Sequence, residues 1–160
     1  MSPKATVLLK QGVPWRPSSI LLLLAGLAVI GIGIYFLFLR PPLLAEDVRF
    51  LQMGEADISA SAPRLAAWLS NVFHVLGGYA VATGLLAMAL AGTAYRRRDP
   101  LAVLGVATSG ISGIGLMAVT NFTIGSDFRW LLLALALLWA ASLACYALEA
   151  LRILSLKGTG

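Results

Sequence analysis

Four long stretches without charge, separated by short polar segments, dominate the pattern of this chain. They contain no Asp, Glu, Lys or Arg and cover residues 20–39, 65–95, 101–126 and 130–148. Roughly 20 helical residues cross the ~30 Å hydrocarbon core of a bilayer, and each stretch is about that long or longer. Lipid offers the backbone no hydrogen-bond partner, and the stretches are too evenly apolar for barrel strands. Each is therefore predicted to be a membrane-spanning helix.

Local helix signals refine the bounds of these helices. The first ends before Pro41, because proline disfavours helical geometry in the residue that precedes it. Asp99 and Pro100 suit the N-cap and first position of the third helix, and Gly125 suits its C-terminus. The prediction is an all-α integral membrane four-helix bundle, one domain over residues 1–160, with helices at approximately 18–39, 64–95, 100–123 and 127–155.

The longest connection, from residue 41 to 62, contains a second periodic pattern. Leu44, Val48 and Leu51 stand at i, i+4 and i+7, while Glu46, Asp47 and Arg49 are directed elsewhere. This spacing is typical of a short amphipathic helix on the membrane surface, which Gly54 would end. The alternative is a solvated loop that leads into the second helix.

Composition supports the membrane interpretation. The chain is 59% apolar and 12% charged, whereas about a quarter of residues are charged in soluble domains. The net charge of +5 could indicate a nucleic-acid partner, but the basic residues flank the apolar stretches instead of forming a stripe. We therefore expect a lipid bilayer and no nucleic acid as partner.

The distribution of basic residues predicts the topology. With the N-terminus inside, eight Lys and Arg residues fall on the cytoplasmic side and four outside. Arg96, Arg97 and Arg98 decide the orientation, because they occupy a very short loop between two spans. We expect both termini in the cytoplasm of a bacterial inner membrane. The first apolar stretch is too long for a cleaved signal peptide, which favours an uncleaved signal-anchor.

Small residues mark the surfaces by which helices pack in lipid, where close backbone approach is favourable. The third helix places such residues at four-residue steps, and the first has two glycines seven apart. The predicted helix-packing residues are Gly26, Gly33, Gly77, Gly78, Gly84, Gly105, Ser109 and Gly113.

His74 is the only histidine and lies within an apolar stretch, where an ionisable group suggests a functional role. It shares a helix face with Asn71 and could reach Asn121 or Thr123. A hydrogen-bonded packing role is the first interpretation; contact with haem or quinone is the alternative. Cys145 is the only cysteine, so the chain has no ligand set for zinc. We predict no metal and no cofactor.

No arrangement of residues indicates catalysis. Glu149 and Arg152 are three apart near the end of the fourth helix, a spacing that permits a local ion pair at the headgroup level. Pairing or snorkelling of these side chains is expected. Trp139, in the middle of the same span, is expected to pack against neighbours. Neither a Ser-His-Asp set, nor paired carboxylates, nor a phosphate-binding glycine loop is present.

The region from Leu43 to Ala91 resembles a group of small bacterial four-span proteins with no assigned activity. The resemblance rests on Asp47-x-x-Phe50, on Ala62-Pro63-Arg64 before the second helix, and on His74 ahead of Gly77-Gly78. In that group Asn is typical where this chain has Ala62. The resemblance implies the same four-span topology and no particular activity.

Three hypotheses about function follow. The first is a non-catalytic accessory, assembly or scaffold subunit that binds a membrane protein or forms a homo-oligomer. The second is an oligomeric transporter of small solutes or lipids. The third is a redox or lipid-modifying enzyme that uses His74.

Overall fold

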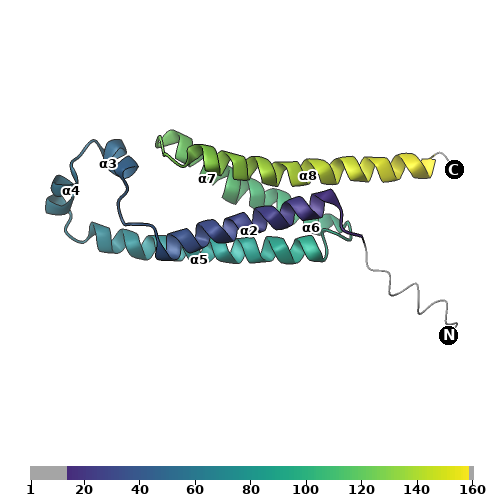
Figure 1. The fold of residues 1–160 in the computed structure, drawn as a ribbon, viewed down its shortest axis with the longest axis horizontal. Helices are drawn as coiled ribbons and strands as arrows, with labels where there is room; N and C mark the ends of the chain where they lie inside the picture. Colours follow the sequence, from purple (N-terminus) through teal and green to yellow (C-terminus); the bar gives the residue numbers. More distant parts are fainter. Residues whose placement is uncertain (1–13, 159–160) are drawn as a thin grey trace, which may run out of the picture.

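The computed structural model describes residues 14–158, with side chains to Ser155, and all regular structure in this part of the chain is helical. The element order is α2 (Pro17–Phe38), α3 (Ala45–Leu51), α4 (Glu55–Ser61), α5 (Leu65–Gly92), α6 (Pro100–Ser109), the π-helix η1 (Gly110–Gly115), α7 (Leu116–Thr123) and α8 (Arg129–Gly158). Figure 1 shows the long helices side by side, with α3 and α4 beyond one end.

Four helices are long and apolar enough to cross a membrane: α2, α5, the continuous helix made of α6, η1 and α7, and α8. Their bounds lie within three residues of those expected from the sequence. The largest differences are at the ends of α5 and α8. The helix α5 ends early, at Gly92, because the backbone then turns so that Tyr95 points into the bundle.

The ends of these helices follow the expected signals. Pro17 and Pro100 occupy first-turn positions, where the missing N–H needs no partner. Asp99 caps α6, because its carboxylate accepts the N–H of Leu101 at 2.8 Å and of Ala102 at 3.4 Å. Gly125 follows α7 with a φ of 66°, a conformation that glycine adopts without a steric penalty.

The amphipathic segment forms a helix, α3, but its orientation differs from the prediction. Glu46 is buried and Leu51 is exposed, so the acidic side faces the protein. The reason is that carboxylates of α3 bind groups of the bundle, as described below. The short helix α4 follows in a segment for which only a lead into the second span was expected.

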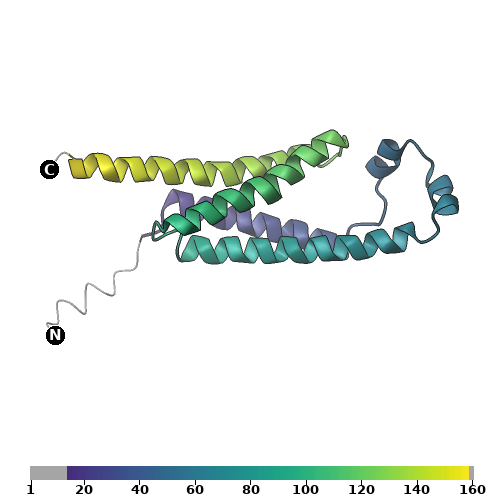
Figure 2. The same cartoon turned by 180° about the vertical axis from the view of Figure 1, so that it is seen from behind.

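The helix α2 packs along both α5 and α8, and is the centre of the bundle. Figure 2, from behind, shows α6 starting near the end of α5 and α7 finishing beside α8. Side chains from all four spans meet in one apolar core. Its buried members are Leu22, Ala25, Val29, Ala87, Ala91, Tyr95, Ala102, Val106, Ile114, Leu135 and Trp139.

Two pairs of glycines bring α2 and α5 into close contact. A Cβ atom added to Gly84 would lie 2.5 Å from the carbonyl oxygen of Gly26, and one added to Gly77 would lie 2.8 Å from that of Gly33. Gly26 and Gly33 of α2 are seven residues apart, and so are Gly77 and Gly84 of α5. Seven residues make about two turns, so the two glycines of each helix lie on the same face. The backbones therefore touch where side chains would separate them.

The other residues of the predicted packing set lie elsewhere. A Cβ atom at Gly78, Gly105 or Gly113 would meet nothing within 4 Å, and all three glycines are exposed. Ser109 is half-buried and its hydroxyl bonds the carbonyl of Val106. Within the described chain these three glycines do not pack against another helix, so any packing by them has to involve another molecule.

The buried row of the third span lies one residue further along than the predicted one: Ala102, Val106, Gly110, Ile114 and Ala118. Four-residue steps drift by about 40° each on an α-helix, about 160° over this row. The wider π-helical turn at residues 110–115 takes up an extra residue and offsets about 100° of that drift. The row therefore keeps facing the bundle.

Adjacent glycines allow a matched test of the α2–α5 contact. Gly77→Ala forces apart the backbones at Gly33 and is expected to lower the free energy of unfolding by about 1–3 kcal/mol. Gly78→Ala fills open space and is expected to be neutral or slightly stabilising, because alanine favours helix more than glycine does. Thermal unfolding in mild detergent, followed by circular dichroism, compares the two; equal effects would contradict the contact.

Candidate functional site

At the end of the bundle where α2 begins, Glu149 joins three separate segments. Its carboxylate accepts the backbone N–H of Ser18 at 3.1 Å and the hydroxyl of Ser18 at 2.8 Å, both at the start of α2. The same carboxylate forms an ion pair with Arg98, from the loop between α5 and α6. A negative charge is favourable beside the N–H groups that open a helix. Glu149 therefore fixes α2 and the loop against α8.

Hydroxyl groups extend this cluster toward the core. The hydroxyl of Ser142 donates to the carbonyl oxygen of Ser18 at 2.8 Å, and the hydroxyl of Tyr95 donates to the carbonyl oxygen of Ser142 at 3.1 Å. All three side chains are almost completely buried. Burial raises the pKa of Tyr95 to about 12, so its hydroxyl stays protonated and able to donate. Each of these three hydroxyl groups thus has a partner.

Arg98 makes further contacts besides its ion pair with Glu149. It donates to the carbonyl oxygen of Tyr146 at 2.7 Å, and its guanidinium carbon lies 4.1 Å from the centre of the Tyr146 ring. The backbone of Arg98 has a φ of 68°, a left-handed conformation that is unusual for a residue with a side chain. The surrounding contacts hold it there.

The pairing expected for Glu149 was wrong. Arg98, not Arg152, is its partner, and Arg152 is exposed. The spacing of three residues favours a local pair only if no stronger partner is near. The start of α2 and the loop arginine bind the carboxylate together. The signal in the sequence is indirect: Ser18 lies in the first turn of an apolar helix, and an acid lies at the same end of the bundle.

The other two arginines of the triplet have different environments. The guanidinium carbon of Arg96 lies 4.5 Å from the centre of the Trp15 ring, which connects the loop to the segment before α2. Arg97 is exposed. The three residues proposed to set the topology therefore also differ in structure, because Arg98 alone enters the bundle.

A second polar cluster closes the opposite end of the bundle. Glu46 of α3 is buried and accepts the hydroxyl of Ser126 and the backbone N–H of Asp127, both at 2.8 Å. Asp127 in turn forms a 2.8 Å ion pair with Arg49. The hydroxyl of Ser126 also accepts the N–H of Phe128, just before α8. These bonds attach α3 to the loop between α7 and α8.

Arg40, which follows α2, supplies a buried cation to this end. Its guanidinium group forms an ion pair of 3.1 Å with Asp47 and lies 3.5 Å from the centre of the Phe73 ring. The carboxylate of Asp47 also accepts the N–H of Leu44 and so caps α3. Arginine suits this position because its flat group stacks on a ring while its edge binds a carboxylate.

His74 and Asn71 lie on an exposed face of α5 and bond only to that helix. The Nδ1–H of His74 donates to the carbonyl oxygen of Ser70 at 2.6 Å, and the amide of Asn71 donates to that of Ala67 at 2.8 Å. The expected contact with Asn121 or Thr123 is absent, because these side chains bond the carbonyl oxygens of Met117 and Val119 in their own helix. The structure thus brings no second functional group to His74.

Ring contacts show the depth of His74. Its neighbour Phe73 packs against Phe36, with ring centres 5.8 Å apart, in the last turn of α2. His74 is therefore level with the end of α2, close to the edge of the apolar slab. An ionisable side chain costs less near the end of a membrane span than at its middle.

Trp139 makes the one polar contact among the described side chains at the centre of the core. The indole N–H donates to the carbonyl oxygen of Val106 at 2.9 Å. Its ring covers Gly110, where an added Cβ atom would lie 2.6 Å from the indole Cδ1. An indole N–H buried in an apolar core needs an acceptor, and the packing role predicted for Trp139 here includes a hydrogen bond.

Few of the described side chains are placed for catalysis or metal binding. No group of three or more His, Cys, Asp or Glu residues in residues 14–158 is placed to hold a metal ion. Cys145 is half-buried and free. Comparisons with protein-family models, curated proteins and solved structures found no match to this chain. The two polar clusters are therefore the most organised features of the molecule, and both connect helices.

Removing the charge of Glu149 tests the first cluster. Glu149→Gln leaves Arg98 without its carboxylate and is expected to lower the free energy of unfolding by about 2–3 kcal/mol, between the values for exposed and fully buried ion pairs. The control is Arg152→Gln, which also removes a charge near the end of α8 and is expected to change stability by less than about 0.5 kcal/mol. Thermal unfolding in detergent measures both effects. An effect of Arg152→Gln as large as that of Glu149→Gln would contradict the partner seen here and favour a local pair of Glu149 with Arg152.

Proposed function

We propose that this chain is a non-catalytic accessory, assembly or scaffold subunit of a bacterial inner membrane, which binds another membrane protein or further copies of itself. The observation that supports this proposal most directly is the division of polar groups within the bundle. The buried polar side chains are Ser18, Ser19, Glu46, Ser126 and Ser142, which lie at the two ends. The core between them is apolar except for the indole of Trp139.

Such an interior favours a role at the surface of the bundle. A transporter needs polar groups or water along its path, and an enzyme needs converging reactive groups. The charged side chains that the described bundle buries are instead used to hold helices together, as Glu149 and Arg98 do. Transport would then require a path between copies of the chain. The enzyme hypothesis would rest on His74 alone.

Exposed surfaces are available for a partner within the bilayer. On the third span Gly105, Ser109 and Gly113 form a seam of small residues. No described helix covers this seam at Gly105 or at Gly113. Small residues at four-residue steps permit the close backbone approach by which helices associate in lipid. We therefore assign this seam to the proposed interface.

Purification in mild detergent tests the proposal. We expect a stoichiometric protein partner or a homo-oligomer when mass is measured by light scattering after size exclusion. Gly113→Leu fills the seam and is expected to reduce the recovered complex about tenfold, the effect of 1.4 kcal/mol in binding. Ile111→Leu, at a neighbouring exposed position, is the matched control. A monodisperse monomer without a partner would count against the proposed function itself.

The proposed orientation places both termini and the arginine triplet in the cytoplasm. We expect a cysteine at the exposed position of Arg97 to stay unlabelled by an impermeant maleimide in intact cells, in a Cys145→Ala background. A cysteine at Glu55, in the exposed part of α4, is expected to react. The reverse pattern would show that the topology is inverted.

A further inference from the structure

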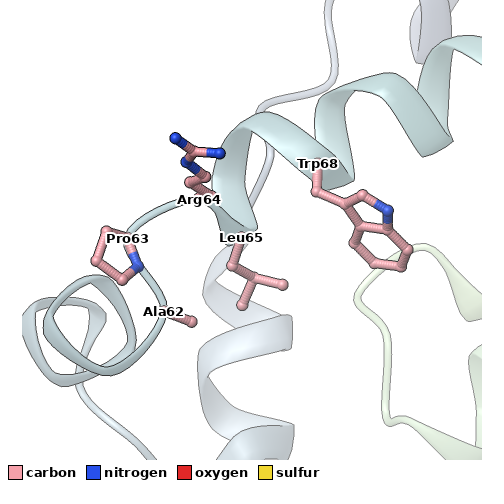
Figure 3. A pocket seen from close by; sticks show the side chains of 5 residues that line it. All are labelled: Ala62, Pro63, Arg64, Leu65 and Trp68. Atoms are coloured by element: carbon pink, nitrogen blue, oxygen red, sulfur yellow. The ribbon is translucent and has the colours of Figure 1, made fainter.

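A shallow hollow opens where α5 begins. It has a volume of about 630 Å³ and is lined by Ala62, Pro63, Arg64, Leu65 and Trp68. Figure 3 shows Leu65 between Ala62 and Trp68, with the guanidinium group of Arg64 at the rim, directed away from the apolar side chains. The hollow thus combines an apolar floor with a cation at its edge.

The position of the hollow along the bundle axis can be judged against the length of α2. The 22 residues of α2 are about 33 Å long, close to the thickness of the hydrocarbon core. Phe73 is level with the last turn of α2, and Trp68 stands five residues before it, about 7 Å further out. The headgroup layer extends about 5 to 7 Å beyond the hydrocarbon on each side. Trp68 therefore lies at the level of lipid headgroups, and Arg64, four residues earlier, lies about 6 Å further out, a distance that an arginine side chain can span.

The hollow also lies above the lipid-facing side of α5. Trp68, Val75, Tyr79 and Leu86 are separated by 7, 4 and 7 residues, which places them within about 40° of one another around the helix. All four side chains are more than half exposed. An acyl chain that runs along Val75 and Tyr79 would reach the hollow beside Trp68.

Arg64 is a cation that the described protein does not neutralise. The ion pairs among the described residues use Arg40, Arg49 and Arg98. A phosphate group would supply the missing charge, because guanidinium and phosphate form strong, often bidentate hydrogen bonds. The indole of Trp68 is suited to the same layer, since tryptophan concentrates at membrane interfaces.

We propose that this hollow is a binding site for a phospholipid of the adjacent leaflet. Arg64 binds the phosphodiester group, and the glycerol and upper acyl chain cover Leu65 and Trp68. The site does not depend on which side of the membrane this end faces. It is also independent of the protein partner proposed above.

Lipid binding to the delipidated, detergent-purified full chain tests this site. Phosphatidylglycerol is titrated in mixed micelles, and bound molecules are counted by native mass spectrometry. We expect one tightly bound lipid. Arg64→Gln is expected to weaken its binding about tenfold, the loss of one charged hydrogen bond. Arg64→Lys keeps the charge and is expected to restore part of the affinity, and Trp68→Ala is expected to weaken binding.

Arg129→Gln is the matched control, because it removes the same charge at the same end of the bundle but away from the hollow. It is expected to leave the bound lipid unchanged. Equal weakening by Arg64→Gln and Arg129→Gln would mean diffuse charge attraction and would overturn the site, as would the absence of a bound lipid. Inorganic phosphate is expected not to displace the lipid, because it cannot cover Trp68. Displacement by phosphate, or binding unaffected by Trp68→Ala, would also overturn the proposal.

Discussion

The contact between α2 and α5 at two pairs of glycines is the interaction on which the other helices depend. Apolar side chains gain nothing from leaving lipid for a neighbouring helix, so association has to come from close packing. At Gly26 and Gly84 the backbones are too near for a side chain on either helix. With α5 held on one side, α2 presents its remaining faces to the rest of the bundle, and α8 packs along it.

Acidic residues bonded to helix starts determine how the helices are joined. Four of the seven acids accept backbone N–H groups at or just before the start of a helix: Asp47 at α3, Asp99 at α6, Glu46 before α8 and Glu149 at α2. Glu46 and Glu149 come from other segments of the chain. Open N–H groups at a helix start attract a carboxylate, and near lipid few other partners exist. The same bonds therefore complete the helix starts and connect distant segments.

Local patterns predicted the spans well and the contacts between them poorly. The bounds of the helices depend on apolar length, on proline and on caps such as Asp99, which all act within a few residues. The partner of Glu149 lies 51 residues away in the sequence, at Arg98, and spacing along one helix cannot reveal it. Gly77 and Gly78 differ by a rotation of about 100° around α5. Which of the two faces α2 can be decided only when the position of α2 is known. The π-helical turn begins at Gly110, which the ring of Trp139 from α8 covers, and this neighbour too is distant in the sequence.

The spans differ in length, and this difference affects which surfaces of the protein are available for binding. With 22 residues, α2 matches the hydrocarbon thickness, whereas α5 has 28 and α8 has 30. Contacts of Phe73 with Phe36 and of Glu149 with Ser18 place the extra turns of α5 and α8 at opposite ends. An apolar interior leaves binding to the outer surfaces, and the projecting turns of α5 and α8 extend these surfaces beyond the two ends of α2.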